Sequence, residues 1–339
     1  MKTLHAGIFN DHDLGGDLIF KKGLEQNGCT VETFDYRAIT AREGRAAMER
    51  SFVEAARDKD MVLIGKGEGF SRTTLAQVRR SGTTISLWYG DTRPEPEPWL
   101  LDLLGEVDCY FMSSGGWELE RYFKHGKPGR AAYYFPPVDP DLVEKYAYLP
   151  SNTQDVIFTG RAYPITGSER REVIAYLRRR GDVKLYGGAE YGSSVLGKGI
   201  RFIQKLTGRT SFVRGEAYVA AIKSARIGIG VNALEGVPRY TSDRLSHYLT
   251  FGTFFLPMYF PELDRLFVEN EELVWFRNVS DLEGKISHYL RNEAEREHIA
   301  AAGQTKALRD LNCADIVAMM LDVARTGQSD RYPWVEVLG

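Results

Sequence analysis

Few cysteines occur in this 339-residue chain, and their positions argue against two classes of protein. Cys29, Cys109 and Cys313 lie far apart along the chain, so they match neither the spacing of a metal site nor an even-numbered disulfide framework. We expect each of them to be a small residue of the core or surface. The sequence therefore predicts a reduced protein that is not held together by disulfide bonds.

Long hydrophobic runs are also missing from the sequence. No stretch approaches the roughly 18 apolar residues that a membrane-spanning helix needs, so no membrane span is expected. The first residues, MKTLHAGIF, turn polar too soon for a signal peptide. We interpret the chain as a soluble, cytoplasmic protein.

The chain has little excess charge of either sign. Its formal net charge of -2 argues against binding nucleic acid by bulk charge alone, although a local basic face remains compatible with it. A composition of 43% hydrophobic and 27% charged residues is that of an ordinary globular protein. At 339 residues, two domains are expected.

Short apolar runs alternate with helical patterns through the first half, which predicts βαβ units on a parallel sheet. The expected strands are 3–9, 30–36, 61–65, 83–89, 108–112 and 131–135. The expected helices are 17–26, 43–57, 71–81, 97–104 and 117–125. A cluster of prolines from Pro136 to Pro150 then predicts a linker.

A second alternating set begins at Asp155. We expect strands at 156–158, 183–186 and 226–231, and helices at 168–180, 281–291, 293–310 and 313–326. Ser280 and Glu283 are predicted to form a capping box at the start of the helix 281–291. Residues 188–214 are rich in Gly, Lys and Arg and interrupt the pattern, as functional insertions often do.

Polar residues gather where the strand Arg226–Val231 ends. Ligands of α/β proteins bind outside the carboxyl ends of such strands, and arginines and hydroxyl groups beside a helix N-terminus suit a phosphate. The loop from Asn232 to Ser242 lies at this end, and Ser242 is predicted to cap the next helix. The candidate phosphate ligands are Arg161, Arg239, Tyr240, Thr241, Ser242 and Arg244.

The loop between the first strand and the first helix carries a second set of candidates. Gly15 and Gly16 could admit a ligand close to the backbone, and Asp13, Asp17 and His12 could supply a base. The pair of glycines lacks the GxGxxG spacing of a dinucleotide site. Acidic residues at a helix N-terminus are also favoured by the helix dipole alone, and this alternative stays open.

Further candidates follow two other strands of the first half. Asp91, in the WYGDTRP segment, could act as a base or contact an acceptor, and Trp88 could line a sugar platform. An Asp-initiated turn before Pro94 is the alternative for Asp91. Glu68, in GKGEGF, is a third candidate base.

The order of these segments resembles the CgeB-like branch of the group 1 glycosyltransferases. The first half matches it loosely, through WYGDTRP and FPPVDPDL (Phe135 to Leu142). The second half matches it at DVIFTG (Asp155 to Gly160), Tyr186, Gly187, Gly188, Gly215, Glu216, Tyr218, Ala225, Asn232, Ser242, Arg244, Gly252 and Leu256. The closing helices match at Leu282, Lys285, Ile286, Tyr289, Leu290, Asn292, Glu295, Arg296, Ile299, Ala300 and Gly303.

This resemblance implies the GT-B fold: two Rossmann-like domains facing a cleft, with a C-terminal helix that crosses back to the first domain. The implied boundaries are 1–140 for an acceptor domain, 141–312 for a donor domain, and 313–339 for the crossing helix and tail. It also implies transfer of a sugar from a nucleotide sugar, with UDP-sugar expected, to an acceptor hydroxyl. No metal or other cofactor is expected.

The resemblance assigns the candidates to roles. Donor binding is predicted for Gly160, Arg161, Gly187, Tyr218, Arg239, Tyr240, Ser242, Arg244, His247 and Gly252. Acceptor binding is predicted for His12, Gly15, Gly16, Glu68 and Trp88, with Asp91 or Asp13 as the catalytic base. Two positions depart from the family pattern. His247 replaces a glutamate that contacts the ribose, and Arg239 replaces a second glutamate.

Other functions stay open from the sequence. Basic residues on the helix at 168–180 and in the 188–214 insertion are usually a solvated face, but they could hold a polyanionic acceptor. A phage-type glycosyltransferase acting on hydroxymethylated DNA bases is therefore one alternative, and a glycan or protein acceptor is the simpler expectation. A non-catalytic module that binds a nucleotide sugar is the second alternative. An epimerase of the same architecture would need a carboxylate cluster that is not evident.

Overall fold

The computed structural model describes residues 1–9, 12–160, 168–187 and 213–339. The chain forms two compact units. The first unit contains Met1–Pro137, Val237–Ser242 and Leu311–Gly339, and the second contains Val138–Gly236 and Asp243–Asp310. The short loop 237–242 thus belongs to the first unit, although the sequence prediction included it in the donor domain.

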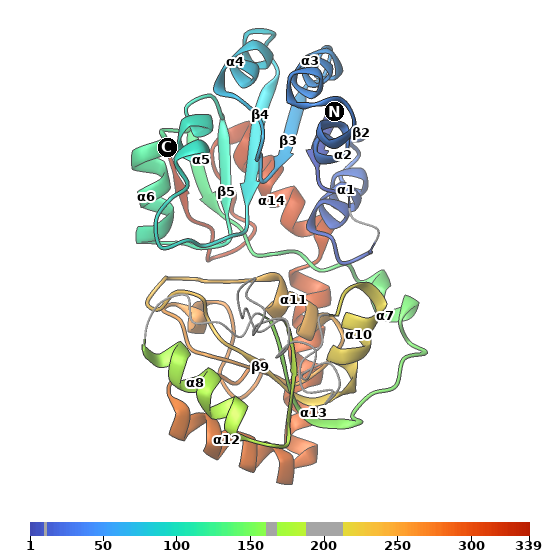
Figure 1. The fold of residues 1–339 in the computed structure, drawn as a ribbon, viewed down its shortest axis with the longest axis vertical. Coiled ribbons are helices and arrows are strands. Elements are labelled where there is room, and N and C mark those ends of the chain that lie inside the picture. The colour runs from blue at the N-terminus through green and yellow to red at the C-terminus, as the bar shows by residue number, and fades with distance from the viewer. Residues whose placement is uncertain (10–11, 161–167, 188–212) are drawn as a thin grey trace, which may run out of the picture. The chain divides into compact units, whose positions relative to one another are not determined.

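A seven-stranded sheet forms the centre of the first unit (Figure 1). Its strand order is β11-β6-β5-β4-β3-β1-β2, and all neighbours are parallel except β11, which pairs antiparallel with β6. The strands are β1 (Lys2–Gly7), β2 (Thr30–Asp35), β3 (Met61–Gly65), β4 (Thr84–Tyr89), β5 (Cys109–Met112), β6 (Arg130–Tyr133) and β11 (Val337–Leu338).

Strand β3 of this sheet is apolar along its whole length because both faces of the sheet are covered. All five residues of β3, MVLIG, are buried, which is the pattern of a parallel strand between two layers of helices. The helices are α1 (Gly16–Gln26), α2 (Tyr36–Glu43), α3 (Arg45–Ala55), α4 (Arg72–Arg80), α5 (Pro98–Leu104), α6 (Trp117–Gly126) and α14 (Cys313–Thr326). The helix predicted over 43–57 is confirmed as α3, with ends two residues inside the predicted range, whereas α2 was not predicted. Gly44, with a φ of +84°, separates α2 from α3.

The C-terminal helix α14 packs on the first helix, α1, and Figure 1 shows the two side by side. Gly23 of α1 makes this close crossing possible, since a Cβ there would lie 2.4 Å from the carbonyl oxygen of Cys313. Asn312 caps α14 by accepting a hydrogen bond from the backbone N–H of Asp315 at 3.0 Å. Residues from opposite ends of the sequence therefore share one hydrophobic core.

A four-stranded parallel sheet of order β10-β9-β7-β8 forms the centre of the second unit. Its strands are β7 (Gln154–Thr159), β8 (Val183–Tyr186), β9 (Ala225–Gly230) and β10 (Phe255–Pro257). The helices are α7 (Asp141–Lys145), α8 (Ser168–Arg179), α10 (Gly215–Ser224), α11 (Asp243–Thr250), α12 (Val279–Arg291) and α13 (Glu293–Asp310), with a 3₁₀ turn at Leu263–Arg265. Val156, Phe158, Ile227 and Leu256 belong to a core cluster that also includes residues of α8 and α12.

The capping box predicted at Ser280 and Glu283 was wrong. Helix α12 begins at Val279, and Asn278 is its cap, accepting a hydrogen bond from the N–H of Asp281 at 3.0 Å. The asparagine competes successfully because its side chain lies at the residue where the backbone is still extended.

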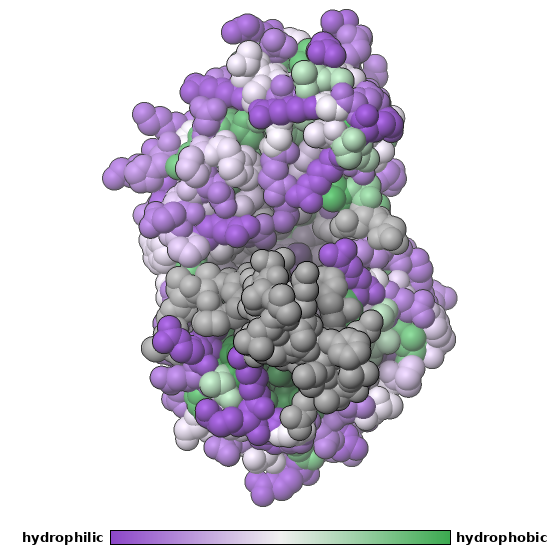
Figure 2. All heavy atoms as spheres, viewed as in Figure 1, coloured by the Kyte–Doolittle hydropathy of each residue, from purple (hydrophilic) through white to green (hydrophobic). Residues whose placement is uncertain are grey.

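The surface seen in Figure 2 is mainly hydrophilic outside the grey atoms, with hydrophobic residues in scattered patches. Among the described residues, the large hydrophobic side chains classed as exposed are Trp117, Tyr148 and Val268. None of the described helices combines the length and the apolar character needed to cross a membrane.

Candidate active site

The sheet of the second unit has its topological switch point between β7 and β9. From β7 the chain continues to β8 on one side of it, and β9 then pairs on the other side. Ligands of open α/β sheets bind in the crevice outside the carboxyl ends of such a strand pair. The residues that follow β7, β8 and β9 are Gly160, Gly187 and Val231, and the first two are predicted donor ligands.

Arg244 lies across this switch point. Its Nη1 donates to the carbonyl oxygen of Val231 at 3.4 Å, and its guanidinium carbon is 5.6 Å from the centre of the Phe158 ring. A Cβ on Gly160 would lie 2.5 Å from Arg244 Nη2. The guanidinium therefore lies against the ends of both β7 and β9, where it can form the bidentate contacts with phosphate oxygens that arginine favours.

Two glycines bring the backbone close together at the same strand ends. Gly160 and Gly187 have φ angles of +138° and +146°, which other residues rarely adopt. A Cβ on Gly187 would lie 1.8 Å from the carbonyl oxygen of Gly160, and the Gly160 N–H donates to Tyr186 O at 2.8 Å. The structure thus favours glycine at both positions through their φ angles, and at Gly187 also through the close backbone of Gly160.

Tyr248 fixes the helix that carries Arg244. The two residues are four apart on α11, so they project from the same face. The Tyr248 ring covers Gly228 of β9, where a Cβ would lie 2.0 Å from it, and stacks on Phe255 with ring centres 4.6 Å apart. Its hydroxyl lies 3.1 Å from Thr159 Oγ1 at the end of β7. This packing sets the position of Arg244 above the sheet.

Tyr218 and His247 form a polar pair beside Arg244. The Tyr218 hydroxyl lies 3.4 Å from His247 Nδ1, and the rings meet edge to face with centres 5.6 Å apart. Burial raises the pKa of Tyr218 to about 12, with the positive charge of Arg244 acting in the opposite direction. The hydroxyl is therefore neutral at physiological pH and carries a proton that it can donate.

The other predicted donor residues fall in several places. Gly252 ends α11 with a φ of +63° and packs on Gln304, which accounts for the glycine without a ligand. Tyr240 and Ser242 are half-buried in the loop 237–242. Arg161, Gly188 and most of the basic insertion, residues 188–212, lie outside the described residues.

Arg239 does not join the group at the second sheet. It is buried in the first unit, where Nη1 donates to Trp334 O at 2.9 Å and Nη2 pairs with the Glu336 carboxylate. A phosphate at this guanidinium would have to replace a carboxylate that is already in place. We therefore leave Arg239 out of the candidate donor site.

The arginines on and next to α8 do not all face solvent as a basic surface. Arg170 is buried, and its Nη1 donates to the carbonyl oxygens of Val231 and Asn232 at 2.8 and 2.7 Å. Arg180 pairs with Asp182 at 2.6 Å. Two of the arginines predicted to face a polyanion thus make contacts within the second unit.

The first unit has its own switch point, between β1 and β3, and Asp17 fills it. The Asp17 carboxylate accepts hydrogen bonds from Ile8 N at 2.6 Å and Trp88 Nε1 at 3.1 Å, and it lies 2.9 Å from His5 Nε2. A Cβ on Gly65 would lie 2.1 Å from Asp17 Oδ1. A buried carboxylate at this point repels a phosphate, so this edge is unsuited to the donor diphosphate.

The predicted acceptor residues around Asp17 are partly structural. Trp88 is buried and donates a hydrogen bond to Asp17. A Cβ on Gly16 would lie 3.2 Å from the Trp88 ring. Gly15 is the residue that precedes α1, and its N–H donates to His12 O at 3.2 Å. Asp13 lies half-buried in the same turn. The platform role predicted for Trp88 is not compatible with its burial.

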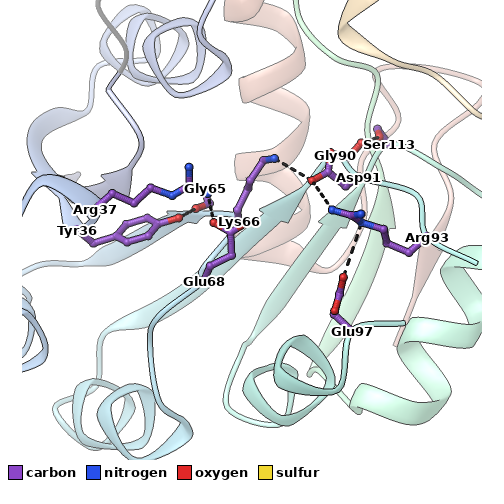
Figure 3. Close-up of polar contacts among 10 residues, drawn as sticks. All are labelled: Tyr36, Arg37, Gly65, Lys66, Glu68, Gly90, Asp91, Arg93, Glu97 and Ser113. Carbon is purple, nitrogen blue, oxygen red and sulfur yellow. Dashed lines mark hydrogen bonds and ion pairs between the residues drawn. The ribbon is translucent and has the colours of Figure 1, made fainter. Parts of the chain in front are cut away.

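Asp91 lies at the carboxyl end of β4 and pairs with Lys66, at the end of β3 (Figure 3). Lys66 Nζ lies 2.8 Å from Asp91 Oδ2, and Arg93 Nη2 lies 3.7 Å from the same oxygen. Both members of the Lys66–Asp91 pair are partly exposed, with 37% exposure for the Asp91 side chain. The pair orients the Asp91 carboxylate and leaves it within reach of solvent, as a base requires.

Lys66 was missed by sequence reasoning. It has a left-handed φ of +62°, which is uncommon for a lysine, and its N–H donates to Trp88 O at 2.9 Å. The sequence feature that could have indicated Lys66 is its position between two glycines in IGKGEG, directly after a buried strand. Glu68, two residues later, pairs with Arg37 instead of facing Asp91, as Figure 3 shows.

No cluster of three or more His, Cys, Asp or Glu side chains suited to a metal occurs within the part of the chain that the structure describes.

Comparison with known proteins identifies the fold and the class. Residues 170–322 match the model of a family described as glycosyl transferase-like. HepE of Anabaena in complex with UDP-glucose superposes with a TM-score of 0.64 at 12% identity, covering 95% of this chain and 99% of that chain. Sucrose-phosphate synthase of Thermosynechococcus elongatus gives 0.61 at 14% identity, covering 96% and 98%. AviGT4, a glycosyltransferase involved in avilamycin A biosynthesis, gives 0.59 at 16% identity, covering 96% and 97%.

These matches confirm the predicted GT-B fold, and the family match confirms the predicted class, a glycosyltransferase. None of the curated proteins compared with the chain matches it in sequence. Membership of the CgeB-like branch stays a prediction.

Proposed function

We propose that this protein transfers a sugar from a UDP-sugar to an acceptor hydroxyl, with the donor diphosphate bound at the β7–β9 switch point of the second unit. The observation that carries the proposal is the position of Arg244, whose guanidinium lies against Gly160 and Val231 at the ends of these strands. Its fixed positive charge would stabilise the diphosphate as it leaves. HepE, of similar fold, was solved with UDP and with UDP-glucose, which supports this donor class.

The Tyr218–His247 pair supports a role for His247 at the ribose. If the neutral Tyr218 hydroxyl donates to Nδ1, then Nε2 carries the proton of a neutral imidazole. An Nε2–H would donate to a ribose hydroxyl, whereas the glutamate of the family pattern would accept from it. The replacement thus reverses the direction of the hydrogen bond and preserves a contact.

Asp91 is proposed as the residue that takes the proton of the acceptor hydroxyl. It is partly exposed and held by Lys66 at 2.8 Å, which keeps its carboxylate oriented. Asp13 is the second candidate, in the turn before α1. We propose that the reaction uses no protein-bound metal, because Arg244 supplies the positive charge that the diphosphate needs.

The test is a calorimetric titration of UDP and UDP-glucose into the wild-type protein and into the Arg244→Ala variant. Wild-type binding that weakens roughly 10-fold or more in the variant is expected, because a charged hydrogen bond is lost. Turnover with UDP-glucose should persist in excess EDTA. Unchanged affinity in a folded Arg244→Ala variant would sink the phosphate assignment. Salt-sensitive binding of hydroxymethylated DNA would instead favour the DNA-acceptor alternative.

A further inference from the structure

The loop 237–242 is held in the first unit by an arginine in an unusual conformation. Arg239 has a left-handed φ of +47°, and its side chain is only 6% exposed. A non-glycine residue keeps such a conformation only where its surroundings fix it. The contacts of its side chain therefore decide the shape of the loop.

Those contacts come from the C-terminal tail and from β6. Arg239 Nη1 donates to the carbonyl oxygen of Trp334 at 2.9 Å, and Nη2 pairs with the carboxylate of Glu336. The guanidinium carbon lies 5.2 Å from the centre of the Tyr133 ring. The last residues of the chain thus form the partner of a loop that lies about a hundred residues earlier in the sequence.

Glu336 joins three segments at this point. Its carboxylate accepts a hydrogen bond from Gly116 N at 3.0 Å, at the start of α6, in addition to its pairing with Arg239. Its carbonyl oxygen accepts from Tyr133 N at 3.1 Å, next to the pairing of β11 with β6. The same carboxylate therefore satisfies a helix N-terminus and a buried guanidinium.

The rest of the loop docks on the turn between β5 and α6. Gly115 N donates to Pro238 O at 2.9 Å, and Thr241 N donates to Ser113 O at 3.0 Å. A Cβ on Gly115 would lie 2.7 Å from the Arg239 guanidinium. The SSGG turn is shaped to receive this loop, and Glu336 closes it from the other side.

We propose that Glu336 is a positioning residue for donor binding, which acts through Arg239. It holds the loop 237–242, with the predicted donor residues Tyr240 and Ser242, in one conformation before the donor arrives. A loop that is already ordered does not lose conformational entropy on binding, so the affinity for the donor is higher. The inference rests on the proposed donor function for its activity readout, and on loop order alone for its structural readout.

The experiment compares Glu336→Ala with the wild-type protein in two measurements. Hydrogen–deuterium exchange of peptides covering 237–242 should accelerate about 10-fold or more, since the loop opens more often once the pairing is lost. The KM for UDP-glucose should rise roughly 10-fold with kcat changed far less, which is the effect of losing one charged hydrogen bond.

Two further variants make the result specific. Arg331→Gln removes an exposed ion pair of the same tail, with Asp322 at 2.6 Å, and should leave both measurements at wild-type values. Glu336→Gln keeps the size of the side chain and an acceptor oxygen for Arg239 but removes the charge. It should give a smaller change of the same sign, and it takes over the test if Glu336→Ala fails to fold.

The two readouts separate the possible failures. Loop exchange that stays at the wild-type rate in folded Glu336 variants would overturn the anchoring role. A faster-exchanging loop with an unchanged KM would overturn the role in donor binding. If the wild-type protein binds no UDP-sugar, the proposed function fails, while the exchange data still decide whether Glu336 anchors the loop.

Discussion

The guanidinium of Arg244 occupies the space that a side chain on Gly160 would need, with Nη2 only 2.5 Å from the position of a Cβ. One residue belongs to the helix after β9 and the other to the end of β7. Because Gly160 has no side chain, the positive charge of Arg244 can lie at the switch point of the second sheet. Substitution of either Gly160 or Arg244 should therefore weaken UDP binding.

Gly160→Ala should therefore weaken UDP binding about as much as Arg244→Ala does, roughly 10-fold or more. The new methyl group displaces the guanidinium, and the φ of +138° is strained for alanine. Calorimetric titration with UDP measures the effect. Gly181→Ala, where no atom lies within 4 Å of the new Cβ, is the matched control and should bind UDP normally. Normal binding by Gly160→Ala would show that Arg244 does not hold the diphosphate where it lies now.

Asp91→Asn should reduce kcat by about 100-fold or more, as expected for a general base, and leave the affinity for UDP unchanged. The pair with Lys66 at 2.8 Å loses its charge, but the side chain keeps its shape. Steady-state kinetics with UDP-glucose and an accepted sugar measure the change. Asp102→Asn, which alters an exposed pair with Arg72 at 3.8 Å, is the control. If Asp91→Asn keeps full turnover, the same experiment on Asp13→Asn tests the second candidate base.

Tyr218→Phe should weaken UDP-glucose binding by about 2- to 10-fold, because it removes the hydroxyl that lies 3.4 Å from His247 Nδ1 and that is proposed to orient the ring toward the ribose. His247→Glu restores the carboxylate of the family pattern and should bind the ribose at least as tightly as wild type. Thermal-shift titrations with UDP-glucose compare the variants. Equal affinity of Tyr218→Phe and wild type would separate the pair from the donor site.

The free energy of unfolding should fall as the pH rises above 10. Burial raises the pKa of both Tyr89 and Tyr218 to about 12, whereas an unfolded tyrosine titrates near 10. Between these values the folded state binds more protons than the unfolded state, so stability is lost with increasing pH. Urea unfolding at pH 8, 9, 10 and 11 measures the slope, and Tyr218→Phe should reduce it. A flat profile from pH 9 to 11 would contradict the burial of these hydroxyls.

Gly23→Ala should destabilise the first unit by about 1–3 kcal/mol, because its Cβ would meet the Cys313 carbonyl oxygen at 2.4 Å and push α14 from α1. Gly284→Ala lies inside α12 with no atom within 4 Å, and should stabilise the protein by about 0.5–1 kcal/mol. Urea unfolding of both variants gives the comparison. A neutral effect at Gly23 would mean that α14 is not closely packed on α1.

Several parts of the fold could be predicted from local patterns. The buried strands and the helices between them follow from periodicity alone, and β3 and β4 lie within two residues of their predicted ranges. The ends of helices were less predictable. Asn278 caps α12 in place of the predicted Ser280, since a cap depends on where the backbone is still extended.

The candidate site shows the same division. Arg244, Gly160, Gly187, Tyr218 and His247 were named from the sequence, and the fold brings them to one end of the second sheet. Lys66 was not named, because a lysine in a left-handed turn has no periodic signal. Arg239 was assigned to the donor, because nothing in its neighbours along the chain points to Glu336.

The alternation of strands and helices, the parallel sheets and the loops at their carboxyl ends follow from local sequence patterns, because they depend on residues that are near in the chain. Which charged side chains pair with each other depends on the tertiary fold. Asp17 closes one switch point and Arg244 lies on the other, and Arg239 pairs with a residue at the far end of the chain. Such pairings depend on how the strands are ordered in each sheet, and that order is a property of the packed fold and not of any local segment.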